Sequence, residues 1–405
     1  MQVIWVYYPP LAGSWSPTVM STSSSEFDRS ASVGFSIPGH AEKILSRSES
    51  PQETTLNLRI VRGPLKPHEN ESILSQYNSL ASANIPPREF LRWIQDGPEG
   101  PAWHAILETE DGDIVGHTSL FPFRATHNGR SLVAAKSEYS FIREEYRASK
   151  IRGFEHTGRL KNLIYIDELF RRCRSEGWGP LLISTSSSFH RVFRSIGCFP
   201  VHFPLWECLL VLRPQEAGWR TPNLRRWQRV SLWAAGLVQT ALWAPSLFLS
   251  GRTKGFRSPS VAQRPFPQLG RSLSFFENRD SLAWRYPEGE YDRIVAEPKG
   301  GADLIVKSGS ASRYLRVCQW HLNSGPPAPA LIASLVQMAH QQKAIGVRWA
   351  VYGEDATSAA LVKRLRNFGF LCARRVRTLL INTADQEFLD PSAWNLTDAM
   401  FSFDL

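Results

Sequence analysis

From residue 56 onward, the hydrophobic pattern alternates between the two-residue period of strands and the 3.6-residue period of helices, and this order constrains the fold most. An acidic turn at 110–113 separates two strand patterns, and Gly177 and Gly197 end two helical ones. The order is strand, helix, helix, three strands, helix, strand, helix and strand, over 56–63, 68–83, 86–95, 102–123, 132–142, 160–178, 180–187, 188–197 and 200–214. Segregated strands and helices of this kind predict an α+β domain with a mixed central sheet flanked by helices.

A second, thinner succession of the same elements follows. After a segment at 281–297, strand and helix patterns follow over 302–309, 314–322, 329–344, 347–353, 355–370 and 373–383. We expect an internal structural repeat by element order, with no short solenoid period. The break at Pro214 and the restart near Ser272 predict two separate cores.

Composition excludes several classes of protein. Hydrophobic residues make up 42% and charged residues 21% of the 405 residues, which is typical of a globular chain. The five cysteines form no CxxC pair, which argues against a disulfide framework and a zinc site and indicates a reducing compartment. His104, His117 and His127 stand isolated, without an HExxH pattern, so no metal site is expected. No GxSxG, P-loop or GxGxxG motif is present.

Two segments differ from the rest. Residues 1–55 are rich in serine and lack a hydrophobic period, so we expect a disordered tail. Between Arg213 and Arg271 lie ten basic residues and one acidic residue, a net charge of +9 in a chain of +10. Charge gathered in a connector does not favour a nucleic-acid interface, which would more often be a basic folded face.

The connector 215–271 also carries an apolar helix pattern over 230–250, with tryptophans nearby. Three alternatives stay open: a helix packed between the two halves, peripheral contact with an anionic membrane through 213–271, and a membrane span. Gln239 and Pro245 disfavour the span.

Several motifs together resemble the GNAT-type N-acetyltransferases, in a duplicated bacterial form. EDGDIVGH resembles the turn between the second and third strands of that family, SFIREEYRAS its fourth strand and acyl-CoA loop, and FHRVFRSIGCFPV its last helix and strand. The segment from Ser281, with W-R-Y, resembles the entry of a second such domain. The resemblance implies two tandem domains, 56–214 and 272–405, joined by the basic, Trp-rich linker 215–271.

The resemblance also implies acetyl-CoA or another acyl-CoA as co-substrate. Its pyrophosphate would be held by backbone N–H groups of a glycine-rich loop at a helix N-terminus. The loop 147–159 departs from the family's spacing but keeps basic residues and glycines, and it supplies the candidate donor-binding residues Arg147, Lys150, Arg152, Gly153, Gly158 and Arg159.

Two residues are candidates for acid–base chemistry. Glu138, on the presumed fourth strand, could accept an amine proton through water. Alternation places Lys136, Glu138 and Ser140 on one face, opposite Ser137, Tyr139 and Phe141, so Glu138 would point away from the core, to a cleft or to solvent. His190 could act near neutral pH, although a surface histidine is the plainer interpretation.

The tyrosine that many family members use as general acid is missing. Alignment on the last helix puts Phe193 and, in the second copy, Leu365 at its place, and neither can donate a proton.

The sequence therefore predicts a cytoplasmic N-acyltransferase that transfers an acyl group to an amine, with peripheral contact at the inner membrane face as an open alternative. The resemblance suggests an amino sugar or a cell-envelope precursor as acceptor. The alternatives are a catalytically silent binding or scaffold protein and a Fem-type aminoacyl transferase.

Overall fold

The structure is a computed structural model, and the residues it describes lie in one folded body. They are 54–81, 84–147, 149–154, 161–184, 190–213, 226, 230, 233–234, 236–238, 273–275, 278–296, 302–307, 314–322 and 329–396. The expected disordered tail and most of the linker lie outside this part of the chain, so those expectations stay predictions.

The N-terminal half follows the predicted element order. Its elements are β1 (Thr55–Arg62), α1 (Pro67–Ala81), α2 (Pro87–Gln95), β2 (Trp103–Glu108), β3 (Ile114–His127), β4 (Arg130–Ile142), the 3-10 turn η1 (Glu144–Tyr146), β5 (Lys150–Ile151), α3 (Lys161–Ser175), β6 (Leu181–Ile183), α4 (His190–Arg194) and β7 (Cys198–Val211). The short strand β5 is the one element that the hydrophobic pattern does not predict.

The C-terminal half repeats the second part of that order. Its elements are β8 (Ser274–Phe275), α7 (Arg279–Arg285), β9 (Tyr291–Ala296), β10 (Ala302–Lys307), β11 (Leu315–Leu322), α8 (Pro329–Gln341), β12 (Gly346–Tyr352), α9 (Ala356–Asn367), β13 (Leu371–Asn382), η3 (Gln386–Leu389) and η4 (Pro391–Ala393). Asp355 begins α9 by accepting hydrogen bonds from the backbone N–H groups of Thr357 and Ser358.

The long hairpin of β3 and β4 is set by its turn. Asn128 and Gly129 both have positive φ, 51° and 73°, and connect the paired residues His127 and Arg130. Two residues in this conformation match the right-handed twist of the flanking strands, and Asn-Gly is the preferred sequence for such a turn. The turn fixes the register that later places the side chains of β3 against β4.

One continuous mixed sheet joins the two halves. Its strand order is β5-β1-β2-β3-β4-β6-β13-β7-β12-β11-β10-β9, with β8 paired to β3. The last strand of each half is inserted into the other: β13 lies between β6 and β7, and β7 lies between β13 and β12. The antiparallel pair of β7 and β13 runs over twelve residue pairs, from Leu371↔Leu209 to Asn382↔Cys198.

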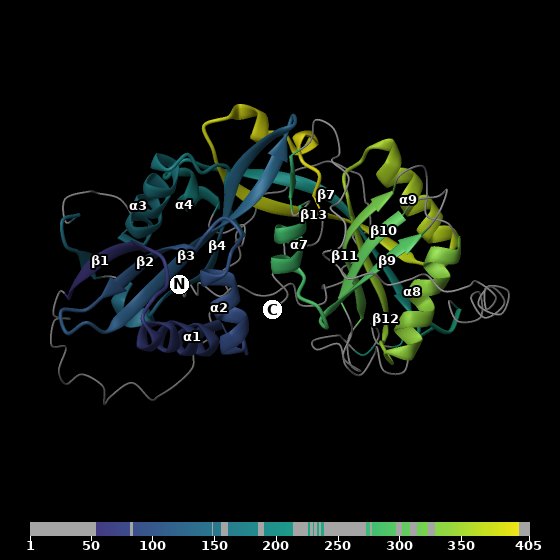
Figure 1. Ribbon diagram of the computed structural model, residues 1–405, viewed down its shortest axis with the longest axis horizontal. Helices are drawn as coiled ribbons and strands as arrows, with labels where there is room; N and C mark the ends of the chain where they lie inside the picture. Colours follow the sequence, from purple (N-terminus) through teal and green to yellow (C-terminus); the bar gives the residue numbers. More distant parts are fainter. Residues whose placement is uncertain are drawn as a thin grey trace, which may run out of the picture.

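Helices cover the sheet on different faces (Figure 1). In the N-terminal half, α1 and α2 lie on one face, and α3 and α4 lie on the other. The α3/α4 core includes Leu169 and Phe193, whereas α8 and α9 close a further core that includes Leu335 and Leu365. Helix α7 lies between the two halves.

The expectation of two separate cores is wrong. The core under α1, α2 and α7 contains residues of both halves, among them Phe121, Leu205, Leu282, Tyr352 and Leu379. The reason is the exchange of β7 and β13, which carries side chains of each half into the other. A mixed α/β fold with a large mixed sheet is confirmed, whereas the boundaries of two tandem domains remain a prediction.

Candidate active site

The parallel strands β4 and β6 separate after a short contact. They pair over three positions, from Ala135↔Leu181 to Ser137↔Ile183, while β4 stays paired to β3 as far as Ile142. Among the described residues, 138–142 have no strand partner on the β6 side. Backbone N–H and C=O groups along such an edge need partners, so an extended ligand with amide groups can pair there. We call this opening the N-terminal wedge.

A β-bulge lies in β4 where the wedge begins. The register with β3 shifts between His117 and Ser119, and Tyr139 has a φ of 53°, in the left-handed region that non-glycine residues rarely adopt. Because of the extra residue, Ala134 before the bulge and Phe141 after it belong to the same core. The prediction that Tyr139 and Phe141 share an apolar face is confirmed, since both pack into the α1/α2 core. Their predicted opposition to the even-numbered residues before the bulge is wrong, because Ala134 belongs to the same core.

Side chains of β3 hold the bulge. Ser119 Oγ donates a hydrogen bond of 3.0 Å to the backbone oxygen of Glu138. His117 Nδ1 lies 2.9 Å from the backbone oxygen of Tyr139, and because a carbonyl only accepts, this nitrogen must carry the proton. Three further hydroxyl groups join β3 to β4 around the bulge, those of Thr118, Ser137 and Ser140. The backbone oxygens of Glu138 and Tyr139 are thus both held by hydrogen bonds from side chains of β3.

His104 and His117 form a buried pair, so their expected isolation is wrong. His104 Nδ1 lies 3.1 Å from His117 Nε2, and both side chains are fully buried. Since His117 Nδ1 carries the proton, Nε2 accepts from His104, and the direction of both hydrogen bonds is set. Burial lowers the pKa of His117 to about 4 and that of His104 well below its usual value. Both rings are neutral near pH 7.

The carboxylate of Glu138 is buried beside an ammonium group at the bulge. Glu138 is 8% exposed, and its Oε1 lies 2.5 Å from Nζ of Lys136, which is fully buried. Bulk solvent is therefore excluded as the surroundings of Glu138. Burial lowers the pKa of Lys136, and the charges of Arg285 and Arg377 add to this, while Glu138 opposes it. Periodicity placed Lys136 on the same face as Glu138 but gave no sign that the two would be buried together.

The candidate donor loop lies only partly near the wedge. Lys150 is in β5, which pairs with β1 at the far edge of the half-sheet, so it lies four strand spacings, about 19 Å, from β4. Arg152 follows it there, is 61% exposed and forms an ion pair with Glu110, and Gly153 has a φ of 83°. Arg147 follows η1 at the end of β4. Gly158 and Arg159 lie outside the described residues.

The second catalytic candidate, His190, is the half-buried first residue of α4, on the chain segment that follows β6. Phe193, in the same helix, and Leu365 in α9 are both buried in the cores beneath their helices. Neither position is open to a leaving group, which agrees with their inability to donate a proton.

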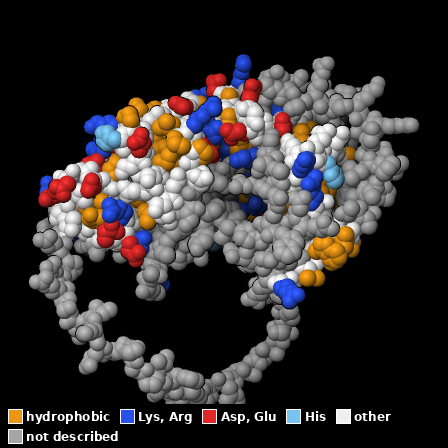
Figure 2. Space-filling model, turned by 90° about the horizontal axis from the view of Figure 1, so that it is seen from below, with side chains coloured by type: hydrophobic (Ala, Val, Ile, Leu, Met, Phe, Trp, Pro, Cys, Tyr) orange, Lys and Arg blue, Asp and Glu red, His pale blue; other side chains and the backbone are white. Residues whose placement is uncertain are grey.

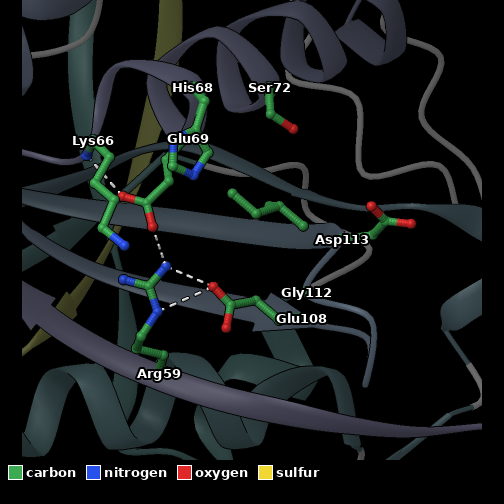
Figure 3. A pocket seen from close by; sticks show the side chains of 9 residues that line it. Arg59, Lys66, His68, Glu69, Ser72, Glu108, Gly112 and Asp113 are labelled. Carbon is green, nitrogen blue, oxygen red and sulfur yellow. Dashed lines mark hydrogen bonds and ion pairs between the residues drawn. The ribbon is translucent and has the colours of Figure 1, made fainter.

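A cavity of about 500 Å³ lies between the beginning of α1 and the β1–β3 strands (Figure 3). In it, the guanidinium group of Arg59 bridges two carboxylates, at 2.6 Å from Glu69 and 2.5 Å from Glu108. Burial would raise the pKa of Glu69, but the Lys66 backbone N–H and Arg59 outweigh it and lower the pKa. None of the nine lining residues belongs to β4 or β6, so the cavity is distinct from the wedge. No group of residues in the described part of the chain could hold a metal ion.

The C-terminal half contains a second wedge. Strands β11 and β12 pair over three positions, from Leu315↔Val347 to Val317↔Trp349, and the register of β10 and β11 then shifts past Cys318. Cys318 and the next residue, Gln319, are both buried, and Gln319 Oε1 accepts a 2.9 Å hydrogen bond from the hydroxyl group of Tyr286. This wedge has the geometry of the first but no acid–base pair at its bulge.

Comparison with known proteins gives a likeness of structure alone. No family model matches the chain, and no curated protein matches it. Similar solved structures include the GCN5-related N-acetyltransferase from Kribbella flavida, with 13% identity, 80% of this chain and 70% of that chain covered and a TM-score of 0.44. The GCN5-related N-acetyltransferase from Anabaena variabilis ATCC 29413 has 11% identity, 80% and 72% coverage and a TM-score of 0.43.

These structures are of the kind that the sequence motifs resemble. With TM-scores below 0.5, the likeness carries no argument about chemistry. The function has to be inferred from the wedge itself.

Proposed function

We propose that the N-terminal wedge transfers an acyl group from acyl-CoA to an amine. The observation that carries this proposal is the buried Lys136–Glu138 pair at the point where β4 and β6 separate. The pantetheine arm of CoA is extended and contains two amide groups. These suit the backbone of 138–142, which has no strand partner on the β6 side among the described residues, apart from the Glu138 and Tyr139 oxygens that β3 already binds. The thioester would then lie beside the bulge.

Glu138 carries out both proton transfers at the reacting atoms. A primary amine is protonated in water and gives its first proton to water before it attacks. As its nitrogen attacks the thioester carbonyl, Glu138 accepts the second proton from that nitrogen. When the carbon–sulfur bond breaks, the CoA thiolate takes this proton from Glu138, which restores the carboxylate. Lys136, which is fully buried, stays in contact with Glu138 as its counter-ion.

In this scheme Glu138 also takes the place of the missing tyrosine, and His190 is not required. Arg147 is the donor-loop residue whose described position, after β4, suits the CoA phosphates. An amino sugar or an envelope precursor as acceptor rests on the sequence resemblance.

The test is a calorimetric titration of the full chain with acetyl-CoA, followed by thiol release with a panel of primary amines. We expect saturable binding of one donor per chain and thiol release only when an amine is present. Absence of binding would overturn the proposal and favour the scaffold alternative. Binding without turnover on any amine would mean that the wedge holds the donor but is catalytically silent.

A further inference from the structure

The helical stretch between β7 and β8 turns an apolar face to solvent. Residues 226, 230, 233–234 and 236–238 are helical. Val230 is 59%, Trp233 44%, Leu237 45% and Val238 60% exposed, and Ala234 is exposed as well. These five residues, which we call the apolar face, span an arc of about 140° at 3.6 residues per turn. Gly236, which is buried, lies outside that arc.

This arrangement is the reverse of an ordinary surface helix, whose apolar side packs against the protein. Seven large hydrophobic side chains are exposed in the described part of the chain, and four of them belong to the apolar face. Figure 2 shows hydrophobic side chains gathered, with a basic side chain nearby, at the end of the molecule where the C-terminal half lies. A contiguous exposed patch of this kind marks an interaction site.

The charge around the apolar face identifies the partner. Arg226 is exposed and falls within the same arc, and the sequence from 213 to 271 has a net charge of +9. An apolar face with basic residues beside it matches an anionic lipid surface, where the side chains enter the interface and the cations meet the headgroups. A second copy of this chain is disfavoured, because a twofold dimer through this face would bring two strongly basic segments together.

In the part of the chain that the structure describes, no helix is long and apolar enough to cross a bilayer. A solvent-facing apolar arc also argues against the alternative of a helix packed between the two halves.

We propose that the apolar face docks the protein on the surface of anionic membranes, with the helix lying in the interface. The docking is independent of acyl transfer, because its residues lie outside both wedges. A basic residue near such a surface strengthens binding about fivefold.

The test is flotation of the full chain with vesicles of phosphatidylcholine alone or with about 30% phosphatidylserine, at low and high salt. We expect flotation with the phosphatidylserine vesicles and at least a tenfold weaker partition at high salt. The double variant Trp233→Asp/Leu237→Asp should lose flotation, and Arg226→Glu should weaken it about fivefold or more. A matched control, Leu80→Asp/Val376→Asp, changes exposed hydrophobic residues elsewhere and should float like the unmodified chain.

Three outcomes overturn the proposal. The first is no flotation with phosphatidylserine vesicles, and the second is equal flotation of the Trp233→Asp/Leu237→Asp variant. The third is a dimer, detected by light scattering without lipid, that the same double variant dissociates, since the apolar face would then bind a second copy. Thermal unfolding of all variants should be unchanged because the substituted side chains are exposed.

Discussion

The two wedges share their pattern of strand pairing and differ in their side chains. In each, a parallel pair three residues long ends at a bulge on the inner strand. The N-terminal bulge presents Glu138 beside Lys136, whereas the C-terminal bulge presents Cys318 and a glutamine already bonded to Tyr286. In both halves the last strand of the other half lies beside the short parallel strand. Only the N-terminal half adds groups that can exchange protons.

The loops that follow β4 and β11 differ in length, and this difference also favours the N-terminal half as the donor-binding half. Eighteen residues separate β4 from α3, but only six separate β11 from α8. A loop of six residues leaves little chain to surround a pyrophosphate group. We therefore expect donor binding at the N-terminal wedge only, and a structural role for the C-terminal half.

The largest expected effect concerns the independence of the halves. A fragment of residues 54–213 lacks β13, which lies between its own β6 and β7, so we expect it to show no cooperative unfolding transition. Co-expression with residues 273–405 should restore one, followed by circular dichroism during urea denaturation. A cooperative transition in the fragment alone would show that the halves are separate domains.

The next effect is catalytic and compares the two bulges directly. Glu138→Gln keeps the shape of the side chain but removes the base, so thiol release should fall about 100-fold or more. The matched change in the other wedge, Cys318→Ser, should leave the rate within about twofold. Acetyl-CoA affinity, measured by calorimetry, should be retained in both variants, and an equal loss of rate in the two would contradict the asymmetry.

The free energy of unfolding should also be more sensitive to substitution at the N-terminal bulge than at the C-terminal bulge. Lys136→Met leaves the buried carboxylate of Glu138 without its counter-ion and should lower the free energy of unfolding by about 3–5 kcal/mol. The double variant Lys136→Met/Glu138→Leu should recover most of this loss, since no buried charge remains. Arg316→Met, at the matching place in β11, should cost about 1 kcal/mol or less in urea unfolding. Equal costs at the two sites would refute a special role for the ion pair.

The last effect is confined to acidic solution and depends on pH. His104 and His117 have lower pKa values in the fold than in the unfolded chain, so between about pH 6.5 and 4 the unfolded chain binds protons that the folded chain does not. Stability should fall as the pH falls through this window, by about 1.4 kcal/mol per pH unit for each histidine. His117→Phe should make urea midpoints less dependent on pH, and no change in that dependence would exclude the pair as its source. The C-terminal bulge has no such pair.

The order of the strands and helices was predictable because it depends on the spacing of hydrophobic residues close together in the sequence. Most strands and helices of both halves agree with the hydrophobic patterns to within a few residues, whereas β5, β8 and α7 were not predicted. Gly177 and Gly197, both at positive φ, follow α3 and α4 as expected. The position of β13 in the sheet was not predictable. Asn382 pairs with Cys198 across a long stretch of sequence, and the hydrophobic pattern of a strand does not indicate which strand lies beside it.

The site was predictable in part. Glu138 was singled out as a candidate base, but its surroundings depend on the bulge at Tyr139, and an extra residue is invisible in a short alternating pattern. His104 and His117 meet only because the β2–β3 hairpin has one particular register. The edge strand β5 is two residues long and carries no periodic signal, so the distance of Lys150 from the wedge could not be foreseen.

The insertion of β13 beside β6 has a consequence for the order in which the molecule is made. A ribosome completes α1 to β7 long before residues 371–382 leave its exit tunnel, so β6 and the wedge it borders wait for the last strand of the chain. A stop codon anywhere before residue 371 therefore removes a strand from the half that carries Glu138 as well as from the half in which it falls. Late truncations should be as damaging to the gene's product as early ones.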